Sequence, residues 1–360
     1  MKRTKFYSKH VELDAKLVEF AGYLMPVQYS SIIDEHKAVR NSVGIFDISH
    51  MGEVIVKGDK AFDFVQHITV NDVAKLSVGR VQYTAMCYED GGIVDDLLVY
   101  KLDENEYLLV INASNIEKDL EWMHKNNSFG AEIKNESDDY SLIAIQGPKS
   151  KKILQKICDV SMELEYYHFI VAKCCNKEVI VSRTGYTGEL GYEVYIKGTE
   201  SEALEIWDAL FEVGAKYKIQ PIGLGARDTL RLEMGFCLYG NDIDATTNPI
   251  EAGLDWITKV KKGEFVGKDA ILEVKSNGVI RKLVAIAFEG KIIPRHGYEI
   301  YSNSTLIGHV TSGTMSPILD KPIAMGYVDV EYSDFDSEVS IKIRNKEISG
   351  KIVTLPFISR

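Results

Sequence analysis

The pattern of apolar residues changes once along the chain, near residue 276. Before that point, runs with the spacing of amphipathic helices alternate with runs that have the two-residue spacing of strands. From SNGVIRK, residues 276–282, onward the chain consists of short apolar runs separated by glycine and polar turn residues, which is typical of an all-β domain. We therefore predict two interleaved α+β domains over residues 1–275 and a barrel-like β-domain over residues 276–360.

Two helices are marked by their first residues. Residues 29–43 predict a short helix that is capped by Ser30 or Ser31 and has acidic residues in its first turn. Residues 114–125 predict a second helix, because the S-x-x-E spacing that starts at Ser114 is that of a capping box.

Charge and cysteine usage exclude several classes of protein. The net charge of -11 over 360 residues argues against a surface for nucleic acid or for an anionic membrane. No run of about 18 apolar residues, the minimum for a membrane helix, occurs, and the polar N-terminus has no signal-peptide core. The five cysteines form no CxxC pair and no even-numbered disulfide framework, which favours a reducing compartment and a cytoplasmic protein.

The segment CYEDGGIVDDLLVY, residues 87–100, places two carboxylates inside an apolar strand pattern. Neighbouring residues of a strand point to opposite faces, so only one of Asp95 and Asp96 can share a face with the apolar residues. One interpretation is that both acids lie at a strand end and cap backbone groups or face solvent. The other is that one of them is partly buried, with a raised pKa suited to holding a proton. Gly91 and Gly92 permit a tight turn before the pair.

Residues 178–196 predict two strands joined by a glycine-rich loop. On the second strand Glu193 and Tyr195 share one face, which is either exposed or lines a pocket. No helix opens after the glycines, so their spacing is not a dinucleotide-binding fingerprint.

The segment GLGARDTLRLE, residues 223–233, predicts a helix with Arg227 in its first turns. A helix N-terminus together with an arginine suits a planar anion. Arg227 and Arg231 lie four residues apart on one face, where Asp228 could pair with Arg231, and such pairs are usually solvated.

Other kinds of catalytic site have little support. Ser49 and His50 are adjacent, but no G-x-S-x-G elbow surrounds them, and no histidine pattern accompanies Cys87. The eight histidines are scattered, so no metal site is predicted. The chemistry must therefore depend on carboxylates and a bound organic molecule.

Several segments together resemble one known family. They are FDISHMGE, YTAMCYEDGGIVDDLLVY, NASNIEKD, AIQGP, SRTGYTGELGYE, GLGARDTLRLE and LYGNDI followed by TNPIEAGL. In this order and spacing they resemble the T-proteins of the glycine cleavage system, over nearly the whole chain. The resemblance implies a three-domain, cloverleaf-like α+β fold around a central cavity that holds folate.

The resemblance also implies an activity and its participants. Proteins of this family are aminomethyltransferases. They take the aminomethyl group from the lipoyl arm of H-protein, release ammonia and use tetrahydrofolate as co-substrate to make 5,10-methylenetetrahydrofolate. The implied partner is lipoylated H-protein, and the expected state is a monomer or a weak dimer.

Carried over by motif, the catalytic carboxylate of the family falls on Asp96. Glu193 is expected to bind the pterin and its amino group, and Arg227 to lie near the folate. The other positions that match the folate pocket are Met51, Tyr83, Asn112, Tyr166 and Tyr186. The chain ends in LPFISR, without the basic extension of some family members, and Arg360 is assigned to the glutamate tail in its place.

Two related functions remain as alternatives. One is a folate-dependent demethylase of a small methylamine or methylsulfonium compound. The fused forms of this class carry an N-terminal flavin domain, for which this chain lacks the length and the G-x-G-x-x-G motif. The other is a non-catalytic folate-binding factor for iron–sulfur assembly, which carries a KGCYxGQE loop where this chain has TGYTGELGYE.

Overall fold

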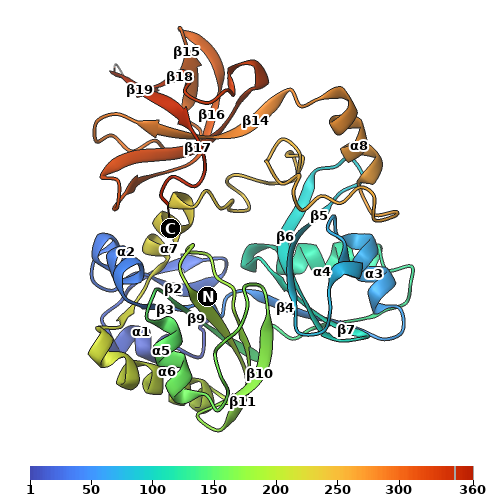
Figure 1. Cartoon of the computed structure of the whole chain (residues 1–360), viewed down its shortest axis with the longest axis vertical. Coiled ribbons are helices and arrows are strands. Elements are labelled where there is room, and N and C mark those ends of the chain that lie inside the picture. The colour runs from blue at the N-terminus through green and yellow to red at the C-terminus, as the bar shows by residue number, and fades with distance from the viewer. Residues whose placement is uncertain (344–345, 360) are drawn as a thin grey trace. The chain divides into compact units, whose positions relative to one another are not determined.

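The computed structural model describes residues 1–343 and 346–359, which form two compact units (Figure 1). The first unit comprises residues 1–65, 73–83 and 97–228, and the second comprises residues 66–72, 84–96 and 229–360. Four elements continue from one unit into the other, namely α3 (Ala61–Ile68), β5 (Val81–Cys87), β6 (Ile93–Asp103) and α7 (Leu224–Glu233). The expected boundary between residues 275 and 276 falls within α8 (Lys268–Asn277) and stays a prediction.

A six-stranded sheet forms the centre of the first unit, in the order β10, β11, β12, β9, β3, β13. Its neighbours are antiparallel except for β13 and β3, which are parallel. The strands are β3 (Gly44–Asp47), β9 (Tyr140–Gln146), β10 (Phe169–Cys174), β11 (Lys177–Ser182), β12 (Gly191–Lys197) and β13 (Gln220–Pro221). One face packs on α5 (Ser150–Ile157) and α6 (Glu200–Gly214), because side chains of both helices join the same apolar cluster as those of β9 and β12.

Strand β12 shows how the two faces of this sheet differ. Tyr192, Val194 and Ile196 lie in the apolar cluster, as the two-residue period requires. Glu193 and Tyr195 therefore point to the opposite face. Both are buried, at 7% and 1% exposure, so the interpretation of this face as exposed is wrong and the pocket-lining interpretation remains.

A second sheet has five strands in the order β5, β6, β7, β4, β8. Besides β5 and β6 it contains β4 (Gly52–Lys57), β7 (Glu106–Ile111) and β8 (Glu132–Asn135). A two-stranded sheet pairs β1 (Lys16–Phe20) with β2 (Tyr23–Gln28). Besides α5, the helices of the chain's first half are α1 (Tyr7–Glu12), α2 (Ile32–Asn41), α3 (Ala61–Ile68) and α4 (Ile116–Lys125). Short 3-10 turns along the chain are η1 (Val73–Lys75), η2 (Ala113–Asn115), η3 (Ala215–Tyr217) and η4 (Val330–Tyr332).

The two predicted helix starts have different outcomes. Ser31 caps α2 by accepting a hydrogen bond from the backbone N–H of Asp34 at 3.1 Å, as predicted. The capping box at Ser114 is wrong, because residues 113–115 form the 3-10 turn η2 and Asn115 takes the cap position without a side-chain hydrogen bond. The helix itself is present. In the 3-10 turn that precedes α4, the backbone N–H of Asn115 donates to the carbonyl of Asn112 at 2.9 Å.

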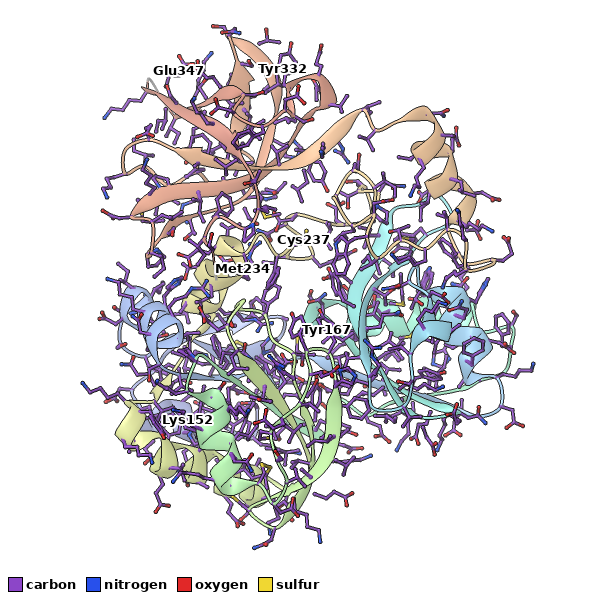
Figure 2. All side chains as sticks on the ribbon, viewed as in Figure 1. Lys152, Tyr167, Met234, Cys237, Tyr332 and Glu347 are labelled. Atoms are coloured by element: carbon purple, nitrogen blue, oxygen red, sulfur yellow. A yellow bond between two sulfur atoms is a disulfide. The ribbon has the colours of Figure 1, made fainter. Side chains whose placement is uncertain are left out.

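The C-terminal residues form a closed barrel in the order β14, β17, β16, β15, β18, β19. Its strands are β14 (Arg281–Phe288), β15 (Glu299–Ser302), β16 (Thr305–Ser316), β17 (Lys321–Asp329), β18 (Glu338–Ile343) and β19 (Lys346–Val353). Alternate side chains such as Ile286, Ile300 and Ile341 fill the interior, and the surrounding surface carries polar side chains (Figure 2). The prediction of an α+β protein with a β-barrel at its C-terminal end is confirmed. Arg360 lies outside the described residues.

The expectation that the cysteines form no disulfide is wrong. Cys158 and Cys174 form a disulfide that joins the end of α5 to the end of β10. The sequence did not indicate it, because the two cysteines are 16 residues apart and only the fold brings those two element ends together. Within the described part of the chain, no helix is long and apolar enough to cross a membrane.

Candidate functional site

Strand β6 begins after a turn that requires two glycines. Gly91 has a φ of +84°, and a Cβ on Gly92 would lie 2.0 Å from the carbonyl oxygen of Ala245. Gly91 therefore supplies a left-handed conformation and Gly92 a close backbone approach. The carbonyl oxygen of Ile93 then accepts a hydrogen bond from the hydroxyl of Tyr239 at 3.1 Å. These contacts hold the start of β6 in a fixed position ahead of the two acids.

The two acids of β6 differ in their access to solvent. Asp95 is fully buried, at 0% exposure, whereas Asp96 is half-buried. Strand alternation predicted that they face opposite sides, and the burial pattern agrees. The pair does lie near a strand end, but the interpretation that both acids face solvent is wrong, and so is a solvent-facing role for Asp95.

Asp96 lies in the second unit, with Cys237 in its electrostatic neighbourhood. Burial raises the pKa of the Cys237 thiol, and the carboxylates of Asp242 and Asp96 raise it further. The thiol of Cys237, labelled in Figure 2, is therefore held protonated and is a poor nucleophile.

In the first unit, Glu193 is held by hydroxyl groups. Thr184 donates to its Oε2 at 2.5 Å. Thr184 in turn lies 2.9 Å from the hydroxyl of Ser182, and Tyr100 lies 3.1 Å from Ser182 and 2.8 Å from the hydroxyl of Tyr195. Burial raises the pKa of Glu193, while the Thr184 hydrogen bond and the charge of Arg227 act in the opposite direction.

Arg227 lies on α7, and its charge interacts with the carboxylate of Glu193. Its guanidinium is 4.7 Å from the ring of Tyr186, a cation–π distance. The start of α7 is fixed because Glu35, on α2, accepts the backbone N–H of Gly223 at 2.8 Å. Arg227 also acts on His50, whose pKa burial and this charge lower to about 4.

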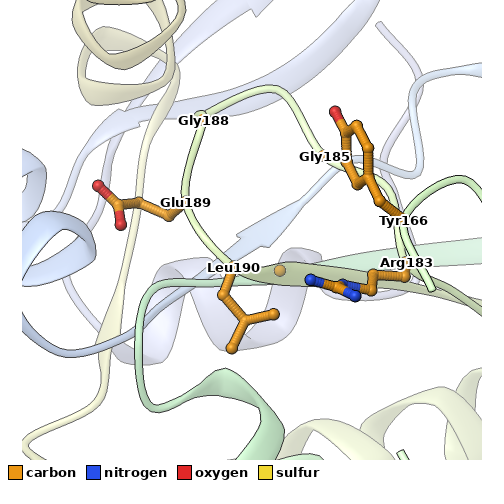
Figure 3. Close-up of a pocket in the computed structure, with 7 residues that line it drawn as sticks. Tyr166, Arg183, Gly185, Gly188, Glu189 and Leu190 are labelled. Atoms are coloured by element: carbon orange, nitrogen blue, oxygen red, sulfur yellow. The ribbon is translucent and has the colours of Figure 1, made fainter. Parts of the chain in front are cut away.

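The glycine-rich loop between β11 and β12 packs on one side chain, that of Gln146. A Cβ on Gly185 or Gly191 would lie within 2.4 Å of Gln146 atoms, and Gly188 has a φ of +76°. Arg40 holds the loop from another side, donating to the carbonyl of Thr187 at 2.5 Å. A pocket opens along the loop, lined by Tyr166, Arg183, Gly185 and residues 188–191 (Figure 3).

The structure places the other predicted pocket residues in the first unit as well. Met51 precedes Gly52 and Asn112 follows Ile111, and because Gly52 pairs with Ile111 the two lie at the same end of β4 and β7. Tyr83 is half-buried in β5. Tyr166 is 57% exposed, and its ring stands edge-on to that of Tyr167, with centroids 4.6 Å apart.

Of the residues predicted from the sequence, the structure brings together Glu193, Arg227, Tyr166 and Tyr186, while Asp96 belongs to the second unit. The sequence analysis did not identify the hydroxyl partners Thr184 and Tyr100. Thr184 stands within the quoted SRTGY segment, and its two-residue offset from Ser182 was the available signal. Arg231 does not remain a solvated surface charge, since it is buried and pairs with Asp242 at 2.7 Å. No cluster of metal-ligating side chains occurs among the residues described.

Comparison with known proteins decides the family. The model described as the GCVT N-terminal domain matches residues 6–262, and that of the glycine cleavage T-protein C-terminal barrel domain matches residues 281–358. The chain belongs to the glycine cleavage T-protein family. The family predicted from the sequence motifs is confirmed.

Full-length relatives agree with this assignment. An aminomethyltransferase from Halothermothrix orenii is 53% identical over 359 residues, spanning 99% of this chain and 100% of the relative. One from Bacteroides fragilis is 53% identical over 361 residues, with 99% of each chain covered. The crystal structure of the glycine cleavage system aminomethyltransferase T from Bartonella henselae superposes with a TM-score of 0.93 at 34% identity, covering 99% of this chain and 98% of that one.

These T-protein relatives also bear on the enzyme class. They are transferases, and the prediction that this chain is an aminomethyltransferase is confirmed. Neither the small-molecule demethylase nor the iron–sulfur factor is favoured by them.

Proposed function

We propose that this T-protein transfers the methylene carbon of aminomethyl-lipoyl H-protein to tetrahydrofolate. The products are 5,10-methylenetetrahydrofolate, ammonia and dihydrolipoyl H-protein. The observation that carries the proposal is the buried carboxylate of Glu193, which is hydrogen-bonded by Thr184 and lies in the field of Arg227. A buried acceptor of this kind is suited to a ligand with adjacent N–H donors, such as the pterin ring and its amino group.

The transferred carbon explains why a carboxylate is sufficient. That carbon lies between a sulfur and a nitrogen, so departure of either heteroatom leaves a cationic, iminium-type centre that a folate nitrogen can attack. Two nitrogens of tetrahydrofolate each form a C–N bond to this carbon and each lose a proton. The bonds from the carbon to the amine and to the lipoyl sulfur break, and the two protons leave on ammonia and on the thiol of dihydrolipoyl H-protein. A carboxylate near the attacking nitrogen can orient it, accept its proton and stabilise the positive charge. The chemistry requires no nucleophilic side chain.

We assign this role to Asp96. Its half-buried position gives it access to a ligand, whereas Asp95 is fully enclosed. The turn at Gly91 and Gly92 fixes the strand that carries it. A fixed carboxylate is what proton transfer at a defined atom needs.

The remaining residues would bind the folate. Arg227, stacked on Tyr186, would pair with a carbonyl or an anionic group. The residues that would line the pocket are Met51, Tyr83, Asn112, Tyr166 and Tyr186. Their rings and thioether suit the flat pterin and benzoyl groups.

The choice between the two acids can be tested with a matched pair of variants. Asp96→Asn keeps the size and polarity of the side chain but removes its base, so we expect turnover to fall by about 100-fold or more while tetrahydrofolate affinity stays within a few-fold of wild type. Asp95→Asn is the control. Steady-state ammonia release and calorimetric folate binding measure both. If Asp95→Asn alone abolished turnover in a protein that still folds and binds folate, the assignment would be reversed.

A further inference from the structure

Five side chains in the first unit form a continuous chain of polar atoms that ends on Glu193. The hydroxyls of Tyr195 and Tyr100 are 2.8 Å apart, Tyr100 and Ser182 are 3.1 Å apart, and Ser182 and Thr184 are 2.9 Å apart. Thr184 lies 2.5 Å from Oε2 of Glu193. All five residues are buried, at 7% exposure or less.

The chemistry of the groups fixes the direction of this chain. A carboxylate can only accept hydrogen bonds, so Thr184 must donate its single hydroxyl proton to Glu193. Thr184 must then accept from Ser182, and Ser182 from Tyr100. Tyr100 has no second proton, and Tyr195 completes the series by donating to it. Every hydroxyl dipole therefore points toward the carboxylate, and hydrogen bonds in such a series strengthen one another.

The arrangement leaves one carboxylate oxygen for a ligand. The other oxygen of Glu193, Oε1, has no hydrogen-bond partner among the residues that the structure describes. Thr184 restrains the carboxyl through Oε2, so the plane of the group, and with it the direction of Oε1, is set by the hydroxyl chain.

We propose that Thr184, supported by Ser182, Tyr100 and Tyr195, is a positioning residue that keeps Glu193 ionised and oriented as the acceptor for the amino group of the pterin. The inference rests on the proposed function of Glu193 in folate binding and adds residues to that site. Without this donor, the buried carboxyl would take up a proton and lose its ability to accept two N–H donors.

The charged and titratable groups around Glu193 define what a pH measurement would report. Arg227 on α7 is the cation that favours the ionised form. Tyr100 on β6, Tyr195 on β12, and Tyr166 and Tyr167 before β10 are in its electrostatic reach, and burial raises the pKa of all four phenols, so they stay neutral. Glu53, whose pKa burial raises, acts on Tyr195, and His50 lies in the field of Arg227. Among the five side chains of the polar chain, Glu193 is the group that titrates on the acid side.

Three variants of the full-length protein separate a positioning role from a structural one. Thr184→Val removes the donor and keeps the shape, and Thr184→Ser keeps the donor. Thr187→Val is the matched control, because it removes another buried hydroxyl of the same loop that bonds Gln146 at 2.8 Å rather than Glu193.

The first readout is the pKa of Glu193 itself, followed by carbon-13 NMR of protein labelled at the glutamate carboxyls and assigned with Glu193→Gln. Removing a donor from the ionised form raises the pKa, so we expect the titration midpoint in Thr184→Val to move up by about one unit, a tenfold change in the proton-binding constant. Thr184→Ser and Thr187→Val should retain the wild-type midpoint. An unchanged midpoint in Thr184→Val would overturn the inference.

The second readout is tetrahydrofolate affinity between pH 5 and 8, measured by calorimetry. Binding should weaken about tenfold in Thr184→Val at neutral pH, and its loss on acidification should begin at a higher pH than in wild type. The titration of the ligand is common to all variants and cancels in the comparison. If wild-type protein bound no tetrahydrofolate, the proposed function would fail while the NMR result still decided the hydroxyl chain. Equal losses in Thr184→Val and Thr187→Val would show a purely structural role.

Discussion

His50 is buried against the ring of Phe20, with ring centroids 5.3 Å apart, and it lies in the field of Arg227. Burial and that positive charge lower its pKa to about 4, although the carboxylate of Asp47 acts in the opposite direction. A neutral imidazole at this position adds no positive charge beside Arg227.

The pH dependence that follows has a definite sign. The pKa of His50 in the unfolded chain is about 6.5, above its folded value, so the unfolded state binds the proton first. Stability is complete above pH ~6.5 and decreases as the pH falls toward 4, by up to about 3 kcal/mol. In His50→Gln we expect a smaller difference in the free energy of unfolding between pH 7 and 4.5, measured with urea. The exposed His124→Gln serves as control, and an acid sensitivity equal to that of wild type in His50→Gln would contradict this account.

Among the elements, the C-terminal turn of α7 carries a buried ion pair that is hydrogen-bonded to the barrel. Arg231, 1% exposed, contacts Asp242 at 2.7 Å and the Ser312 hydroxyl on β16 at 2.7 Å. Asp242 also accepts from the hydroxyl of Thr311. Arg231 also donates to the carbonyl of Phe236, and Asp242 accepts the backbone N–H of Leu238. The hydroxyls of Thr311 and Ser312 tie this charged pair to strand β16.

Removal of one partner leaves a buried charge uncompensated. We expect Arg231→Met to lower the free energy of unfolding by about 3–5 kcal/mol, and the double variant Arg231→Met/Asp242→Leu to regain part of that loss. Lys60→Met, which breaks the exposed pair with Asp63, should cost less than about 1 kcal/mol. Denaturant unfolding of the three variants measures this. A loss in Arg231→Met no larger than that in Lys60→Met would be incompatible with a buried, uncompensated Asp242.

The sequence predicts these elements unevenly, for a physical reason. Side-chain period is a local property, so the helix after Ser31 and the two faces of β12 follow from the sequence directly. Partners distant in the chain do not. Three such contacts depend on how the chain folds back on itself: the pairing of Arg231 with Asp242, the disulfide between Cys158 and Cys174, and the contact of Tyr100 with Thr184.

The division of the whole molecule into two units is likewise not predictable from local sequence patterns. Residues 66–72 and 84–96 group with the C-terminal part of the chain rather than with their sequence neighbours. Asp96 is thereby in a different unit from Glu193, although both were assigned to one site. Motifs identified the family and the candidate residues, because the ordered set of short segments extends over nearly the full length. They could not indicate how the chain distributes these segments between its units.

We propose that this chain moves a one-carbon unit from a protein-bound aminomethyl group to folate. To test this, the purified protein is mixed with aminomethyl-loaded, lipoylated H-protein, and ammonia release is followed with and without tetrahydrofolate. We expect tetrahydrofolate-dependent release, with formation of 5,10-methylenetetrahydrofolate in equal amount. Turnover of dimethylglycine or another small methyl donor in place of aminomethyl H-protein would contradict this function.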